Sequence, residues 1–213
     1  MPDIQYFYST HSAYAYLGAK KLAAICATHD CRLIHRPFEL SPAVEAAGGL
    51  PFAGRTQAHV DYFFGREIER WAAYRGLPVL DHRPTFHDAP LHLSSGLLIA
   101  AMNAGRDIDA LSFALLQSHW RDDSNLSSAD DLAKAASSIG IDAAALLDQA
   151  MSASVQQTFA NNTAEAIDRS LFGSPTYILG DEVFYGQDRL ELLEHALTTP
   201  FPKPGFRNPP VTG

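Results

Sequence analysis

The sequence has 213 residues, of which 46% are hydrophobic and only 19% are charged, and its formal net charge is −8. A chain of this length and composition can bury a real core, so it forms one compact domain or one domain with an insertion and is neither disordered nor fibrous. The negative charge and the lack of any Lys/Arg run argue against nucleic acid as a partner, because clustered cations supply affinity for phosphate backbones.

The sequence predicts a soluble protein of the cytoplasm. Its first residues lack the basic and apolar regions of a signal peptide, and no apolar run reaches the length of a membrane span, so we expect no membrane partner. Cys26 and Cys31 are separated by four residues, unlike a redox CxxC pair or half of a zinc site. We expect both thiols to be reduced and buried.

The chain begins with a predicted strand–helix–strand unit. Residues 3–8 are aromatic or β-branched, and residues 13–27 place apolar side chains at helical spacing. Residues 31–37 alternate polar and apolar side chains before a proline, which predicts a second strand. Units of this kind place their two strands in parallel.

The middle of the chain is predicted to be helical. Residues 40–52 are rich in Pro, Gly and Ala, which predicts an irregular connection of a length that often serves binding. The segments that follow with helical spacing are residues 57–74, 91–103, 107–121, 128–139, 143–151 and 154–170. Ser128 and Asp142 are suited to cap two of these helices.

Strand patterns return near the C-terminus. Residues 176–179 and 182–185 flank a Gly-Asp turn and predict an antiparallel hairpin, residues 187–197 predict a closing helix, and residues 201–213 form a Pro-rich tail. The predicted fold class is therefore α/β, in which βαβ and ββα units are separated by a large all-helical insertion.

Ser12 lies directly before the first predicted helix, and the residues alone leave two roles open. The simpler role is an N-cap, in which the hydroxyl accepts a hydrogen bond from an amide of the first turn. Alternatively, the hydroxyl donates to a bound thiolate, whose charge the helix dipole also favours. Asp188 is likewise either a cap of the closing helix or a binding residue.

The histidines and aromatic residues give weaker signals. Nine histidines lack the paired spacing of a zinc site, so we predict no metal and expect surface or core histidines, His82, His87, His92 and His119 among them. His11 is expected in a solvent-facing loop, with the mouth of a pocket as the alternative. Tyr14 and Phe38 are expected in the core or in the wall of an aromatic site.

Several motifs, spread in order over most of the chain, together resemble those of the 2-hydroxychromene-2-carboxylate isomerases and the related kappa-class glutathione transferases. They are Tyr6-Phe7-Tyr8, Ser12-Ala13-Tyr14-Ala15-Tyr16-Leu17, Glu69-Arg70-Trp71-Ala72, Asn162-Thr163-Ala164-Glu165-Ala166, Phe172-Gly173-Ser174-Pro175-Thr176 and Gly186-Gln187-Asp188-Arg189-Leu190. The resemblance implies a thioredoxin-like domain of residues 1–45 and 172–200, a helical insertion of residues 46–171 as in disulfide-oxidoreductase-like proteins, and a tail of residues 201–213.

The resemblance also implies glutathione as cofactor and a role for each matching residue. Ser12 would be catalytic and contact the glutathione sulfur. Ser174, before a cis Pro175, would pair with the cysteinyl segment of the tripeptide. Gln187 and Asp188 would face its γ-glutamyl end, where a carboxylate suits the ammonium group.

This chain departs from the family pattern in two places. Where relatives carry an Asn and a Lys, it has Gly49 within Gly48-Gly49-Leu50-Pro51 and His59 within His59-Val60-Asp61. The glycine carboxylate of glutathione would then face Gly49 and His59, and it would either lack its usual charged partner or have Arg55 or His59 in its place. The relatives' Ser-Pro-Tyr-Ser is Ser12-Ala13-Tyr14-Ala15 here, which removes preorganisation rather than chemistry.

The function implied is that of a glutathione-dependent isomerase in aromatic catabolism, which interconverts a 2-hydroxychromene-2-carboxylate-like hemiketal and its open-chain unsaturated 2-oxo acid. Its partners would be a small aromatic-derived carboxylate and a second copy of the chain in a homodimer. The alternatives are a kappa-like glutathione transferase and a non-catalytic thioredoxin-like binding module. Protein-disulfide exchange is excluded, because Ser12 and Ala15 stand where both thiols would have to be.

Overall fold

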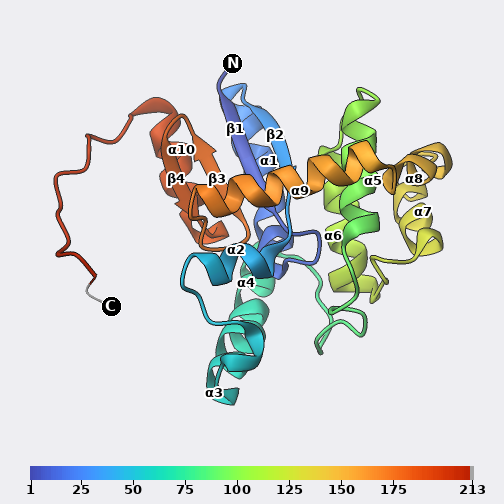
Figure 1. Cartoon of the computed structure of the whole chain (residues 1–213), viewed down its shortest axis with the longest axis horizontal. Helices are drawn as coiled ribbons and strands as arrows, with labels where there is room; N and C mark the ends of the chain where they lie inside the picture. Colours follow the sequence, from blue (N-terminus) through green and yellow to red (C-terminus); the bar gives the residue numbers. More distant parts are fainter. Residues whose placement is uncertain (212–213) are drawn as a thin grey trace.

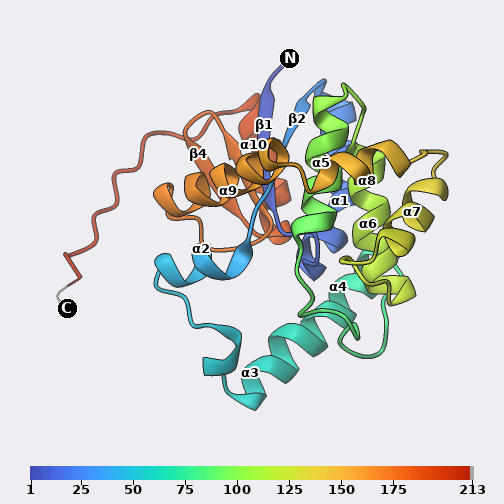
Figure 2. The same ribbon diagram turned by 45° about the vertical axis from the view of Figure 1, so that its right-hand side comes forward.

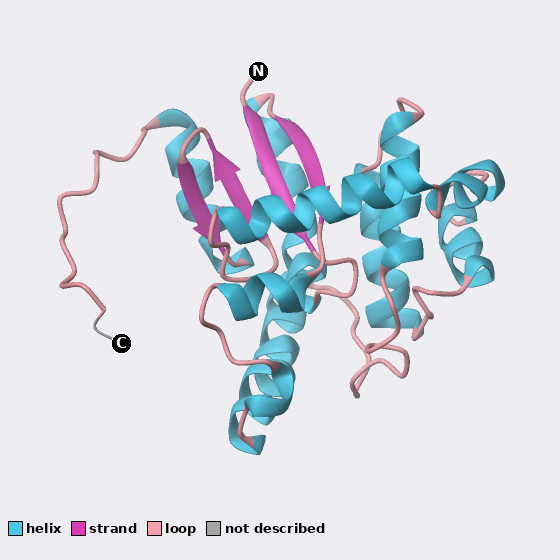
Figure 3. Ribbon diagram, in the orientation of Figure 1, coloured by secondary structure: helices cyan, strands magenta, loops and turns pink. Residues whose placement is uncertain are grey.

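The structure is a computed structural model, and it describes residues 1–211 apart from the side chain of Phe52. Its strands form a single four-stranded sheet in the order β2-β1-β3-β4 (Figure 3). The strands are β1 (Asp3–Tyr8), β2 (Arg32–Pro37), β3 (Thr176–Leu179) and β4 (Glu182–Tyr185). β1 is parallel to β2, whereas β3 runs antiparallel to both β1 and β4. The predicted parallel pair and the predicted hairpin are both confirmed.

Helices make up most of the remaining chain (Figure 1). They are α1 (Ala13–His29), α2 (Leu40–Ala46), α3 (Gln57–Asp61), α4 (Glu67–Arg75), α5 (His92–Asn103), α6 (Asp109–Asp122), α7 (Ala129–Ser137), α8 (Ala144–Ala150), α9 (Ala153–Asp168) and α10 (Leu190–Thr198). A π-helical turn over Tyr62–Arg66 joins α3 to α4, and short 3-10 turns occupy Phe52–Gly54 and Gln187–Arg189.

The two faces of the sheet are buried in separate clusters because successive side chains of a strand point to opposite faces. Tyr6 and Tyr8 of β1 belong to the main core together with the apolar residues of α1 and α10. Phe7 points the other way and packs with Ala43 of α2 and Ala166 of α9. Thus α1 and α10 cover one face, while α2 and α9 cover the other (Figure 2).

The helical insertion is joined to the sheet by packing and by a buried polar chain. α6 lies along α1, and α5 packs between α8 and α9. The hydroxyl of Tyr8 lies 2.9 Å from Nδ1 of His35, and Nε2 of the same ring lies 2.7 Å from the carboxylate of Asp109. Since the carboxylate accepts, Nε2 donates to it and the hydroxyl donates to Nδ1. The start of α6 is therefore tied to β1 and β2.

Two predicted segments differ from the structure. Residues 40–52 are not wholly irregular, because α2 begins at Leu40 and carries Pro42 in its first turn, where a missing amide N–H is tolerated. Residues 57–74 form α3 and α4 around the π-turn rather than one uniform helix. Ser128 caps α7 as expected and accepts from the amide of Asp131. The N-cap of α8 is Ala143 rather than Asp142, whose carboxylate one position earlier accepts from the amide of Ala144.

The remaining expectations concern the thiols, the membrane and the tail. Cys26 and Cys31 are both free thiols, the first buried and the second half-buried. Within residues 1–211, no helix combines the length and apolarity that crossing a membrane requires. Residues 201–211 contain no regular secondary structure and are exposed, and the last two residues of the predicted tail lie outside the described part of the chain.

Candidate functional site

A cavity of about 480 Å³ opens where the start of α1 meets α2, the α3–α4 segment and the loop that follows α4. This volume falls within the roughly 300–1,000 Å³ of small-molecule sites. In Figures 1 and 2, α3 and α4 extend away from the sheet beyond α2, and they form one wall. Residues that line the cavity include Ser12, Tyr14, Leu40, Val44, Arg55, His59, Phe63, Phe64, Ile68, His87, Trp120, Phe172, Ser174 and Tyr185.

Ser12 lies in the cavity wall at the start of α1, and its hydroxyl both accepts and donates a hydrogen bond. It is the N-cap of α1, and its Oγ accepts a hydrogen bond from the amide of Ala15 at 3.2 Å. The same hydroxyl donates to the backbone carbonyl of Ser174 at 3.2 Å. Ser12 is only 7% exposed, and the small exposed part borders the cavity. The capping role inferred from the residues alone is confirmed.

The first turn of α1 gives this end of the cavity a positive character. The first amides of a helix have no helical carbonyl to bond, and Ala13 and Tyr14, which carry two of them, both line the cavity. α1 is 17 residues long, so its dipole adds partial positive charge at the same place. An anion held beside Ser12 would be favoured by the hydroxyl, the amides and the dipole together.

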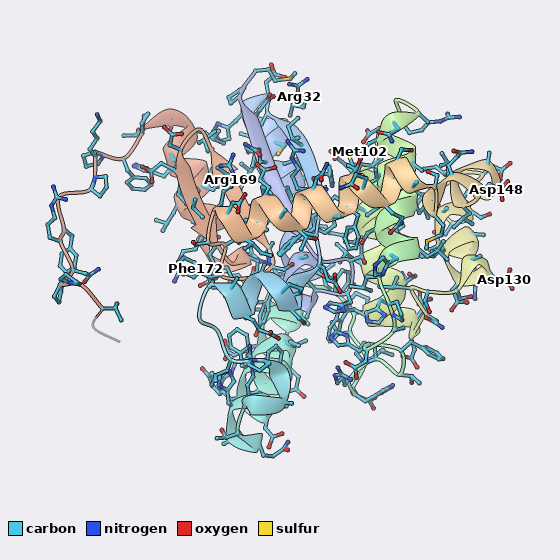
Figure 4. The ribbon with its side chains drawn as sticks, viewed as in Figure 1. Arg32, Met102, Asp130, Asp148, Arg169 and Phe172 are labelled. Atoms are coloured by element: carbon cyan, nitrogen blue, oxygen red, sulfur yellow. The ribbon has the colours of Figure 1, made fainter. Side chains whose placement is uncertain are left out.

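Ser174 and Pro175 are held against Ser12 by contacts across the sequence. The peptide bond between them is cis. The Oγ of Ser174 accepts from the amide of Ser9 at 3.0 Å, so the loop before α1 fixes the segment before β3. At Gly173 a Cβ would lie 2.8 Å from the ring of Tyr185, and glycine is what allows this close approach in the cavity wall. Phe172, labelled in Figure 4, precedes this segment and lines the same cavity.

Aromatic rings and one cation line the opposite wall. The guanidinium of Arg55 lies 5.0 Å from the ring centroid of Phe64, and one of its nitrogens lies 3.4 Å from Nε2 of His59. Its buried Nε has no hydrogen-bond partner among residues 1–211, and no ion pair there joins it to a carboxylate. Tyr14 donates its hydroxyl to the carbonyl of Phe63. This wall offers apolar surface and a positive charge.

The structure places only part of the predicted site at the cavity. Ser12, Ser174 and His59 line it, whereas Gly49, Pro175, Gln187 and Asp188 do not. The amide of Gly49 donates to the carbonyl of Val44 and helps to end α2. The buried Gln187 accepts from Arg75 at 3.1 Å, which ties α4 to the turn before α10.

Two other expectations concern residues near this site. The exposed carboxylate of Asp188 pairs with the neighbouring Arg189. No side-chain cap bond to α10 is formed, so the alternative capping role of Asp188 is not seen. Phe38 is fully buried against Phe7 in the core, which corrects its expected alternative place in the cavity wall.

His11, His87 and His119 form a cluster at the cavity, although no spacing in the sequence groups them. His11 is half-buried and stacks on His87 at 4.5 Å between ring centroids, so it does not face solvent from a loop as expected. Nδ1 of His87 lies 3.0 Å from Nε2 of His119. Burial is the main cause that lowers the pKa of His11 to about 4 and holds those of His87 and His119 below their ordinary value.

Most of the cavity wall could not be identified from sequence. Phe63, Phe64 and Trp120 follow the helical spacing of core residues, and His87 lies in a segment without any periodic pattern.

Among residues 1–211, no group of three or more His, Cys, Asp or Glu side chains is arranged to hold a metal ion.

Comparisons with known proteins agree with this architecture. The chain is 27% identical over 195 residues to a 2-hydroxychromene-2-carboxylate isomerase of Sphingobium xenophagum, an alignment covering 91% of this chain and 97% of that protein. A protein of the same name from Pseudomonas putida is 24% identical over 202 residues, covering 91% and 93%. The solved structure of a 2-hydroxychromene-2-carboxylate isomerase superposes with a TM-score of 0.74 at 22% identity, covering 92% of this chain and 94% of that one.

The family model for the DSBA-like thioredoxin domain matches residues 3–198, which include the whole sheet and all the helices of the insertion. The chain therefore belongs to the family of DSBA-like thioredoxin domains.

Proposed function

We propose that this protein is a glutathione-dependent isomerase that acts on a 2-hydroxychromene-2-carboxylate-like hemiketal and its open-chain unsaturated 2-oxo acid. The named relatives, which match nearly their whole length, support an isomerase. The observation that carries the glutathione part is the hydroxyl of Ser12 at the N-terminus of α1, in the wall of the cavity and beside the carbonyl of Ser174.

Residues at two walls of the cavity fit the sulfur and the glycine carboxylate of glutathione. Ser12 and the amides at the start of α1 would hold its sulfur as an anion, and the backbone of Ser174 would pair with its cysteinyl segment. Asp188 would receive its ammonium group, although its carboxylate lies outside the cavity wall. Arg55 supplies a cation for the glycine carboxylate, beside His59 and in place of the lysine that this chain lacks.

When bound, glutathione supplies a thiolate that adds reversibly to a conjugated carbon of the substrate and so permits rotation about the former double bond. Ser12 stabilises that anion by donating a hydrogen bond from its hydroxyl, and the dipole of α1 acts in the same direction. Each unit by which the thiol pKa falls corresponds to about 1.4 kcal/mol of preferential stabilisation of the anion. The aromatic wall with Phe63 and Phe64 excludes water and orients the substrate ring.

The test compares the variant Ser12→Ala with the variant Ser128→Ala. Each serine caps a helix through the same kind of bond, at 3.2 Å to Ala15 and 3.3 Å to Asp131, but only Ser12 lines the cavity. Ser128→Ala should lose about 1 kcal/mol of stability, and Ser12→Ala should lose more because it also loses the bond to the carbonyl of Ser174. Only Ser12→Ala should raise the pKa of bound glutathione, followed by thiolate absorbance, and lower isomerisation by roughly 10- to 100-fold.

Equal thiol pKa values and equal turnover in the two variants would contradict the proposal. The product distinguishes the alternatives, since a transferase consumes glutathione into a stable conjugate whereas an isomerase returns it. If glutathione raises the melting temperature of this protein but neither isomerisation nor conjugation is detected, the protein is a binding module. The cytoplasmic location and the homodimer stay predictions.

A further inference from the structure

The cluster of His11, His87 and His119 joins three separate parts of the chain at the cavity. His11 precedes α1, His87 belongs to the loop after α4, and His119 lies near the end of α6. His11 and His87 line the cavity, whereas His119 is fully buried behind them. The stack between the first two rings and the hydrogen bond between the last two fix the orientation of the ring of His87.

The hydrogen bonds determine which nitrogen of each ring carries a proton. Nδ1 of His119 lies 3.0 Å from the backbone carbonyl of Ser124, and a carbonyl only accepts, so this Nδ1 carries a proton. In the neutral ring, Nε2 of His119 then holds the lone pair. Nδ1 of His87, at 3.0 Å, must donate to it. The lone pair of His87 is consequently on Nε2.

His87 is therefore an acceptor with a fixed tautomer in the wall of the cavity. No hydrogen bond within residues 1–211 uses its Nε2. We propose that Nε2 of His87 accepts a hydrogen bond from a hydroxyl group of the ligand, and that His119 is the positioning residue that keeps this nitrogen unprotonated. The choice of an aromatic hydroxy acid as ligand rests on the proposed function.

Burial first, and the neighbouring charges second, keep His87 neutral. Desolvation lowers the pKa of His87 most, the histidines His11 and His119 and the cation Arg83 lower it further, and Asp88 alone opposes them. Arg83 is engaged with the carboxylate of Asp88 through two bonds. The ring remains an acceptor across the neutral and mildly acidic range, so the preference for a hydroxyl should not change between pH 8 and pH 5.

The experiment measures calorimetric affinities for three probes that differ at one position: trans-2-hydroxycinnamate, trans-cinnamate and trans-2-methoxycinnamate. The hydroxyl compound should bind about tenfold more tightly than either of the other two, as expected for one hydrogen bond in a partly buried site. Since cinnamate is smaller and the methoxy compound larger, a difference in size cannot give this order. In His87→Phe, which keeps an aromatic ring against His11, the three affinities should become equal.

His195→Phe is the matched control, because His195 is an exposed histidine of α10 outside the cavity wall and should leave the tenfold preference intact. Nitrogen-15 spectra of the unsubstituted protein should show His87 protonated at Nδ1 and not at Nε2. In His119→Phe both tautomers of His87 should appear, whereas His119→Gln, whose amide oxygen can accept the same bond, should restore the Nδ1 form.

Equal binding of the probes to the unsubstituted protein, no binding of any probe, or a proton on Nε2 of His87 would each overturn the proposal. A preference that survives in His87→Phe would do the same. None of these measurements involves glutathione or turnover, so the result is separable from that of the Ser12 experiment.

Discussion

At the scale of single residues, the cavity combines an anion site and a cation at different walls. Ser12 and the first amides of α1 lie at one wall, and Arg55 lies at another with an unpartnered buried Nε. The glutathione of the proposed function would present two anionic groups, its thiolate and its glycine carboxylate. Since Gly49 and His59 stand where relatives carry an Asn and a Lys, we propose Arg55 as the partner of the glycine carboxylate.

Replacement of Arg55→Gln tests this assignment against the glycine ethyl ester of glutathione. The unsubstituted protein should bind glutathione roughly tenfold more tightly than the ester, because a charge-assisted hydrogen bond contributes about 1.5–3 kcal/mol. Arg55→Gln should bind both equally, as titration calorimetry would show. If His59→Gln abolishes the difference while Arg55→Gln retains it, the carboxylate partner is His59.

At the scale of elements, the insertion depends on the close contact between α5 and α8. A Cβ at Gly96 would lie 2.2 Å from the backbone oxygen of Ala150, so no larger residue fits without moving a helix. That oxygen also accepts from Nε2 of Gln156 at 2.7 Å, and the carbonyl of His92 accepts from the same amide at 3.1 Å. One side chain of α9 thereby fastens the end of α8 and the start of α5.

Gly96→Ala should accordingly destabilise the protein by about 1–3 kcal/mol, as overpacking of a close contact does. Gly65→Ala is the matched control, because Gly65 lies in the helical segment between α3 and α4 with open space where its Cβ would be. There the better helix propensity of alanine should leave stability unchanged or raised by up to about 1 kcal/mol. Chemical denaturation measures both, and a Gly96→Ala protein as stable as Gly65→Ala would refute the packing argument.

At the scale of the whole molecule, buried histidines lie where β1, β2 and the start of α1 meet α6 and the loop after α4. His35 links β1 and β2 to α6 through Tyr8 and Asp109, and the cavity cluster links the start of α1 to the end of α6. Folding therefore removes several imidazoles from water. The stability of the complete chain becomes sensitive to pH through the members of the cavity cluster, whose pKa values burial lowers.

The sign of the pH effect follows from proton counts. An unfolded histidine titrates near 6.5, whereas the pKa of His11 in the folded chain is about 4. Between these values the unfolded state binds more protons, so the free energy of unfolding falls as the pH is lowered from 7 to 4. Arg83 strengthens this effect at His11 and Asp88 opposes it.

Unfolding in urea at pH 7, 6 and 5 should show this loss, and His11→Phe should reduce it by on the order of 1–2 kcal/mol across the range. The carboxylates of Asp88 and Asp123, whose pKa values are lowered by Arg83 and Thr85, lose their contributions only at lower pH. His195 is exposed, so His195→Phe should keep the full pH dependence of the free energy of unfolding. Parallel curves for His11→Phe and the unsubstituted protein would contradict the prediction.

Local chemistry made the strands, most helices and the cap at Ser12 predictable, because each depends on neighbouring residues in the sequence. α2 was missed since Pro42 resembles a helix breaker unless its place in the first turn is known. The hydrogen bond between His87 and His119 joins residues 32 positions apart, and His87 lies in a loop without periodicity, so residue spacing could not predict it. Likewise, no local pattern shows that Gln187 turns inward to Arg75.

A hydroxyl can donate only one hydrogen bond, and the Ser12 hydroxyl donates it to the carbonyl of Ser174. A hydrogen bond from Ser12 to the sulfur of the proposed glutathione would require rotation of the hydroxyl, and the same rotation would release the carbonyl of Ser174 for the amide of the cysteinyl residue. One rotation of the hydroxyl would thus replace the hydrogen bond between Ser12 and Ser174 with two hydrogen bonds to the ligand, one from each residue. In Ser12→Ala the carbonyl is released already, so this variant should bind the thiol form of the proposed glutathione as firmly as before and lose affinity only for the thiolate, which separates binding of the tripeptide from activation of its sulfur at a single atom.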